Sequence, residues 1–120
     1  MWAIRASMAT IAPVAPQPTV FPKGAVEMAL MGELLDIATA EARVRSITLP
    51  ADRPGQIAAA VPMDSLSVVA TLIAVEAVVG FELKESLVRT GGYNSVQAAV
   101  DHLLPRIQVA WDRKKKGSKP

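Results

Sequence analysis

A strongly apolar helical stretch, which begins at Asp64 or Ser65 and runs to about Val79, constrains the fold more than any other feature. It carries two apolar stripes about a third of a turn apart, the first made of Val68, Leu72, Val75 and Val79 and the second of Leu66, Val69 and Ile73. One face of a helix cannot bury both stripes. A helix buried on most sides is one explanation, but a domain of three or four helices rarely encloses a member completely. We therefore expect the second stripe to contact other proteins.

Length and composition predict one small helical domain. The chain has 120 residues, and 51% hydrophobic residues with only five large aromatic side chains indicate a core of Ala, Val, Leu and Ile. We expect an all-α fold, a bundle of three to four helices that acts as a monomer. Cysteine is absent, which excludes disulfides, thiolate metal sites and cysteine nucleophiles and favours the cytoplasm. The longest apolar run, Val68 to Phe81, is interrupted by Thr71 and Glu76, so no stable membrane insertion is expected.

Other elements follow from periodicity and from turn residues. A first helix is predicted from Ala25 to about Arg43, followed by a long connection over residues 46–63 that contains three prolines and one turn of helix at 56–60. Gly80 is expected to end the apolar helix as a C-terminal cap. A brief helix is then centred on residues 86–89, and Gly91 and Gly92 turn the chain.

The last helix is expected to begin after Asn94, which would act as its N-cap while Gln97 reaches back to the cap amide. Its apolar face consists of Val96, Ala99, Val100, Leu103 and Leu104. Pro105 is expected to bend or stop this helix. Ile107 and Trp111, four residues apart, could then add one further turn over the core.

Charge is distributed unevenly along the chain. Residues 64–104 hold two basic and five acidic side chains, whereas residues 105–120 hold six basic and one acidic side chain. We expect residues 105–120 to be a C-terminal extension with a disordered basic tail, rather than a nucleic-acid arm. The proline-rich residues 1–23, in which Met8 is an alternative start, are expected to form a flexible leader. Residues 24–104 are left as the folded domain.

Ser65 is the residue with the most informative chemical setting. It stands at the start of a helix with an acid before it and no base near it in sequence, which suits a hydroxyl that another enzyme modifies. His102 is the only histidine, and without cysteine or an acid cluster at ligand spacing no metal site is expected. A hydrolase built from Asp64, Ser65 and His102 would lack the Gly-x-Ser-x-Gly elbow, so we do not expect an enzyme.

Residues 25–104 resemble the acyl carrier protein family. The resemblance is carried by Asp64-Ser65-Leu66, by the following helix with Val69, Leu72 and Glu76, and by the string Ser-Val-Gln-Ala-Ala-Val-Asp over residues 95–101. It implies that a phosphopantetheinyl transferase attaches a 4′-phosphopantetheine arm to Ser65, with Asp64, part of the motif that the transferase recognises, and Leu66 beside it. An acyl group would then be held on the arm as a thioester.

The resemblance also implies a partner surface and an acyl-chain pocket. The surface, which would contact an acyl-loading ligase or synthase and an acyltransferase, consists of Leu66, Val69, Ile73 and Glu76. The pocket would be lined by Leu72, Val75, Val79, Leu83, Tyr93, Ala99 and Leu103. Plain core packing explains these seven residues equally well.

Three features depart from the family pattern, one of which is that the leader and residues 105–120 lie outside the usual domain. Pro62 and Met63 precede Asp64, whereas the family usually has Gly two residues before the acid. Positions that usually carry acids for docking on basic enzymes are here Ser67, Ala70, Ala77 and Val78. We therefore expect few, dedicated partners bound by apolar contact, in a specialised lipid or polyketide pathway. An unmodified carrier-like adaptor is the main alternative, and a nucleic-acid binder that uses the basic tail is a weaker one.

Overall fold

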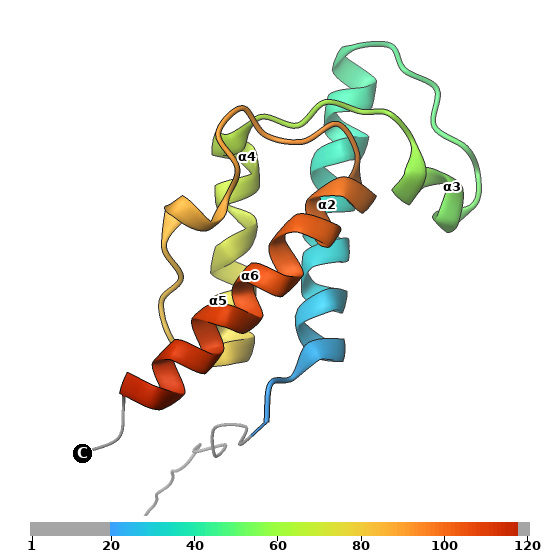
Figure 1. Ribbon diagram of the computed structural model, residues 1–120. Coiled ribbons are helices and arrows are strands. Elements are labelled where there is room, and N and C mark those ends of the chain that lie inside the picture. The colour runs from blue at the N-terminus through green and yellow to red at the C-terminus, as the bar shows by residue number, and fades with distance from the viewer. Residues whose placement is uncertain (1–19, 118–120) are drawn as a thin grey trace, which may run out of the picture.

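A computed structural model describes residues 20–117, with side chains to Lys115, and over this range the chain is an all-α bundle without strands. The elements are α2 (Lys23–Val44), α3 (Arg53–Ala58), α4 (Ser65–Val69), α5 (Thr71–Val79), the 3-10 helix η1 (Glu85–Leu87) and α6 (Val96–Gly117). Figure 1 shows α2 and α5 standing side by side, with α6 crossing in front of them. The expectation of a small all-α bundle is confirmed. The expected leader falls, up to residue 19, outside the described residues.

Helix α2 forms the centre of the bundle because it packs against α5 and also against α6. Its buried side chains lie on one face, as an amphipathic helix requires, and apart from the adjacent Leu34 and Leu35 they recur every three or four residues: Val26, Leu30, Leu34, Leu35, Ala38 and Ala42. Ile37, which lies between them in sequence, is only half-buried. The helix starts at Lys23, directly after Pro22, and so begins two residues earlier than predicted.

The apolar helix predicted from Asp64 or Ser65 to Val79 is divided into α4 and α5 at Ala70. The buried Thr71 explains the interruption, since its hydroxyl donates a 2.7 Å hydrogen bond to the Val68 carbonyl three residues earlier. Side-chain bonds of this kind compete with the helical ladder and bend helices. The end of α5 is as predicted: Gly80 has φ 87° and its N–H donates to the Glu76 carbonyl at 2.8 Å.

The start of α6 differs from the prediction by one residue. The capping side chain is Ser95, whose hydroxyl oxygen accepts from the Ala98 N–H at 3.0 Å. Asn94 is not the cap because its backbone is engaged elsewhere: its carbonyl accepts from the Val61 N–H at 2.8 Å. Gln97 does not reach back either, and its amide donates instead to Asp101 one turn further along.

The last helix continues through Pro105, so the proline does not stop it, which was one of the two outcomes that we expected. Pro105 and Asp101 are both exposed, so the carbonyl that loses its amide partner lies on the solvent side. Beyond the proline, Ile107 is fully buried and Trp111 is 4% exposed. The core therefore extends past residue 104, where we expected the folded domain to end.

The basic residues 113–116 are also not the disordered tail that we expected, because they belong to α6. Trp111 anchors this end of the helix: its ring centroid lies 5.9 Å from that of Phe21 and 6.2 Å from that of Phe81. Lys114 lies over Phe81, and Lys115 lies over Trp111 with its Nζ 4.7 Å from the ring centroid. No helix over residues 20–117 has the length and apolar character that a bilayer span requires.

Candidate functional site around Ser65

Ser65 is the first residue of α4, as predicted, and Asp64 is its N-cap. The Asp64 Oδ1 accepts from the Ser67 N–H at 2.7 Å. Hydrogen bonds from the Ser67 backbone and side chain to the carboxylate, with a smaller one from the Leu66 backbone, lower the pKa of Asp64 below its ordinary value. The carboxylate is therefore ionised at neutral pH. Ser65 itself is half-buried, and no hydrogen bond joins its hydroxyl to His102.

The approach to Ser65 is held by a short antiparallel contact that the sequence did not reveal. Met63 and Tyr93 exchange two backbone hydrogen bonds, of 2.8 and 2.9 Å. Gly92 makes the contact possible, since its φ is +82° and a Cβ atom there would lie 2.0 Å from the Met63 carbonyl oxygen. Gly91 and Gly92 do turn the chain, as predicted, but Gly92 also brings the segment before α6 against the residue that precedes Asp64.

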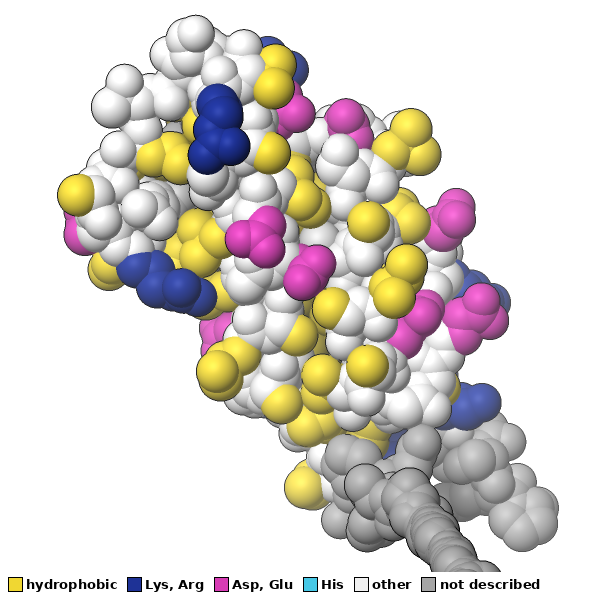
Figure 2. Space-filling model, turned by 180° about the vertical axis from the view of Figure 1, so that it is seen from behind, with side chains coloured by type: hydrophobic (Ala, Val, Ile, Leu, Met, Phe, Trp, Pro, Cys, Tyr) yellow, Lys and Arg dark blue, Asp and Glu magenta, His cyan; other side chains and the backbone are white. Residues whose placement is uncertain are grey.

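Two residues of the predicted partner surface are strongly exposed. Leu66 is 84% exposed and Ile73 is 70% exposed, whereas Val69 is partly buried because it packs against the core. Seen from behind, α2 and α4–α5 present many apolar side chains to solvent (Figure 2). Large exposed apolar side chains at helical spacing favour an interaction surface over a helix buried on all sides.

Glu76, the fourth residue of that predicted surface, has a structural contact. It is half-buried, and its Oε2 accepts from the Leu83 N–H at 2.8 Å. This bond ties the segment after α5 back onto the helix. One of the oxygens of the only acid on α4 and α5 is therefore engaged within the domain, which further weakens charge steering by this face.

All seven residues predicted to line an acyl-chain pocket are buried in one apolar cluster: Leu72, Val75, Val79, Leu83, Tyr93, Ala99 and Leu103 are between 0% and 5% exposed. Their clustering agrees both with a pocket for an acyl chain and with ordinary packing of the hydrophobic core. An open groove is found between residues 81–87 and α6, and of these seven only Leu83 lines it.

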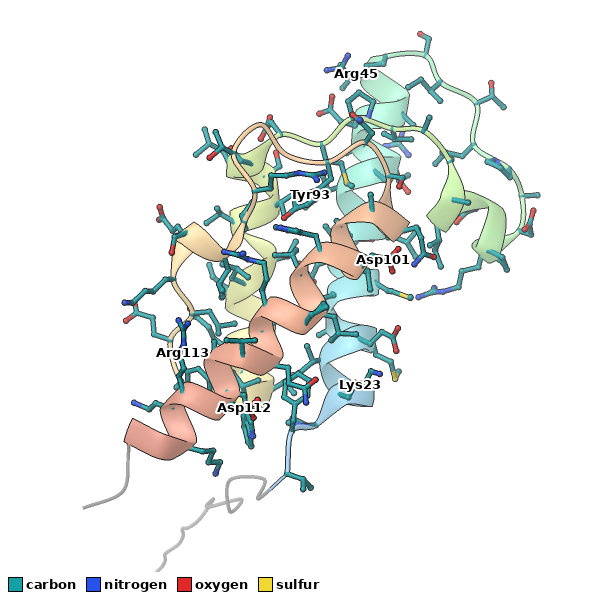
Figure 3. The ribbon with its side chains drawn as sticks, viewed as in Figure 1. Lys23, Arg45, Tyr93, Asp101, Asp112 and Arg113 are labelled. Atoms are coloured by element: carbon teal, nitrogen blue, oxygen red, sulfur yellow. The ribbon has the colours of Figure 1, made fainter. Side chains whose placement is uncertain are left out.

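Tyr93 and His102 form a polar pair inside this otherwise apolar region. The Tyr93 hydroxyl accepts from the Arg89 N–H at 2.9 Å and lies 2.7 Å from His102 Nδ1 (Figure 3 labels Tyr93). The bond from Arg89 leaves the hydroxyl proton free to donate, and we infer that it donates to Nδ1 of a neutral His102 protonated on Nε2. Burial, and then the charges of Arg106 and Arg89, lower the pKa of His102 in agreement with this state.

Over residues 20–117 no group of three or more His, Cys, Asp and Glu side chains could hold a metal ion. Comparison with protein-family models, with curated proteins and with solved structures found no match to the chain. A functional assignment therefore depends on the residues around Ser65 and on the resemblance of their pattern to carrier proteins.

Proposed function

We propose that the protein is an acyl carrier and that Ser65 holds the acyl group through a 4′-phosphopantetheine arm. The observation that supports this most is the position of Ser65 as the first residue of α4, next to its ionised cap Asp64 and to the 84% exposed Leu66. Ser65 is half-buried, so part of the residue remains open to a modifying enzyme. It has no partner that would turn its hydroxyl into a nucleophile, so the protein itself is not proposed to be an enzyme.

The local chemistry suits a phosphodiester at this position. The N-terminal end of α4 carries the positive end of the helix dipole, which favours an anion, while its Ser67 N–H is already bound by the Asp64 carboxylate. The arm, when bound, would supply the thiol that carries the acyl group. The chain's own contribution is to hold Ser65 at a capped helix end whose approach is locked by the Met63–Tyr93 contact.

Leu66 and Ile73 are the proposed contacts for the transferase and for the enzymes that load and unload the carrier, an acyl-loading ligase or synthase and an acyltransferase. Their exposure of 84% and 70% leaves two large apolar side chains unburied along α4 and α5. Since the same helices offer only the half-buried Glu76 as an acid, binding would depend on apolar burial. Dedicated partners of a specialised lipid or polyketide pathway would suit such a surface.

The carrier proposal is tested by incubating the protein with a broad-specificity phosphopantetheinyl transferase and coenzyme A and weighing it intact. We expect wild type and Ser67→Ala to gain one phosphopantetheine group and Ser65→Ala to gain none. Ser67 is a matched control because it is the other hydroxyl of α4: alanine retains the backbone N–H from which Asp64 Oδ1 accepts at 2.7 Å and removes only the side-chain hydrogen bond to that carboxylate. An unmodified wild type would favour the alternative, a helical adaptor that acts only through protein contacts.

A further inference from the structure

An open groove of about 600 Å³ lies between residues 81–87 and the C-terminal half of α6. Its volume is within the range of small-molecule sites, roughly 300–1,000 Å³. None of residues 64–73 lines it, so it is separate from the Ser65 site. The proposed carrier function does not account for this groove, and a ligand bound there would not require that function.

The groove combines an apolar lining with cations. Apolar side chains come from Phe81, Leu83, Leu87 and Ala110, and positive charges from Lys84, Arg106, Arg113 and Lys114. Glu82 is the only acidic side chain among the lining residues. None of the four cations forms an ion pair with a described residue, the one such pair in that range being Arg45 with Glu41.

The geometry of α6 explains why these charges converge. Arg106, Ala110, Arg113 and Lys114 are spaced by four, seven and eight residues and so share one face of the helix, next to the face that buries Ile107 and Trp111. Figure 3 shows Arg113 on the side of α6 that faces the segment after α5. The continuation of the helix past Pro105 thus builds this side of the groove.

Two contacts hold the opposite side in place. Arg106 donates from Nε to the Leu87 carbonyl at 3.0 Å and from Nη2 to the Ser86 carbonyl at 3.2 Å. The Lys114 Nζ lies 6.0 Å from the ring centroid of Phe81. Both contacts join a cation of α6 to the segment that carries the apolar residues, and neither supplies a negative charge to neutralise it.

We propose that this groove binds a single-chain anionic amphiphile, that is, an unbranched alkyl chain with a carboxylate or phosphate head. The alkyl chain would cover the half-buried Phe81, Leu87 and Ala110. The head group would lie between Arg113 and Lys114, which are exposed and charged and form no ion pair with a described residue. The alkyl chain therefore matches the apolar lining and the head group matches the cations. A purely apolar or purely anionic molecule would match only one of the two.

The test is a titration of the ¹⁵N-labelled full chain with dodecyl phosphate and, separately, with dodecanoate, both kept below their micelle concentrations. We expect saturable shifts of the amide signals of Leu87, Ala110 and their neighbours, and the tighter of the two probes identifies the head group. Shifts centred on Leu66 and Ile73, or shifts that do not saturate, would overturn the assignment of the groove.

Charge variants separate specific binding from detergent-like adsorption. Arg113→Glu combined with Lys114→Glu should weaken dodecyl phosphate binding roughly tenfold, since two attractive charges become repulsive. The matched control is Arg53→Glu together with Arg43→Glu, which reverses two exposed charges outside the groove and should leave binding unchanged. Dodecyltrimethylammonium and inorganic phosphate should both bind much more weakly than dodecyl phosphate. Equal binding of the cationic amphiphile, or a response only to a peptide of alternating glutamate and leucine, would refute the proposal.

Discussion

Gly92 is the residue at which the structure leaves least room for a side chain. It is buried, it has φ +82°, and an added Cβ would meet the Met63 carbonyl oxygen at 2.0 Å and the backbone of Asp64 at 2.9 Å. These are backbone atoms, which cannot move aside without breaking the Met63–Tyr93 contact. The geometry around Ser65 therefore depends on the absence of a Cβ atom at position 92.

Gly92→Ala is therefore expected to destabilise the fold by about 2 kcal/mol or more, through backbone strain and a steric clash. Gly91→Ala is the matched control: its φ is +90°, but nothing lies within 4 Å of its Cβ, so it should cost only about 1 kcal/mol. Urea unfolding of both variants measures the difference. Equal losses would show that the close approach to Met63 contributes nothing.

His102 gives the stability of the protein a pH dependence. Its folded pKa lies below the ordinary value of 6.5, so the unfolded chain takes up the proton first as pH falls. The contribution of His102 to the free energy of unfolding is therefore at its maximum above about pH 6.5. It decreases as the pH falls from there toward the folded pKa. Denaturant unfolding from about pH 8 to about pH 5 should show this decline in wild type and a flatter profile in His102→Gln.

Asp64→Asn serves as the control for that profile. The pKa of Asp64 is lowered from an already acidic value, so its cap is lost only at a lower pH than the one at which His102 titrates. The variant should therefore keep the decline that His102 causes. A wild-type profile that is flat across the range would contradict the inferred neutral imidazole.

At the scale of elements, packing by residues beyond Pro105 stabilises the C-terminal half of α6. Trp111 packs against both Phe21 and Phe81 and thereby connects the last helix to the start of α2 and to the segment after α5. Ile107, one turn earlier, is fully buried. Such packing stabilises a helix more than the propensity of its sequence does.

Trp111→Ala is expected to lower the free energy of unfolding by about 3–5 kcal/mol, the usual cost of removing a buried Trp side chain. Val109→Ala, on the same helix but 48% exposed, should cost less than about 0.5 kcal/mol. Thermal and urea unfolding compare the two variants. A Trp111→Ala protein as stable as wild type would show that residues past 105 are not part of the folded unit.

Local signals in the sequence identified several element boundaries. The Asp64 cap and the Gly80 C-cap were predictable because each depends on residues within a few positions. The continuation through Pro105 was not, since it depends on packing between Trp111 and residues distant in sequence. The shift of the α6 cap from Asn94 to Ser95 has a similar cause, the pairing of Asn94 with Val61.

At the scale of the whole molecule, the two faces of the bundle differ in charge. The Ser65 face presents Leu66 and Ile73 beside the ionised Asp64, whereas the groove beside α6 carries four cations and one acid. The exposed stripe on α4 and α5 was predictable from one helix alone. The groove was not, because it arises only when residues 81–87 are brought against residues 106–114.

The partner surface can be tested on the whole protein, unmodified for the transferase reaction and modified for the loading reaction. Ile73→Asp and Leu66→Asp should slow modification by the transferase, or loading by a partner enzyme, by roughly tenfold through loss of apolar contact. Both side chains are more than two-thirds exposed, so the fold should be unaffected. Val109→Asp, an exposed apolar position on α6, is the control and should leave both rates unchanged. Equal effects at all three positions would argue against a surface on α4 and α5.

The most direct test of the carrier assignment is a fragment mass spectrum of the protein after treatment with transferase and coenzyme A. A peptide that spans residues 53–84 contains both Ser65 and Ser67, so fragmentation can assign the modified hydroxyl. We predict one phosphopantetheine group, located on Ser65 and on no other residue. A group located on Ser67, or a peptide that remains entirely unmodified, would contradict the assignment.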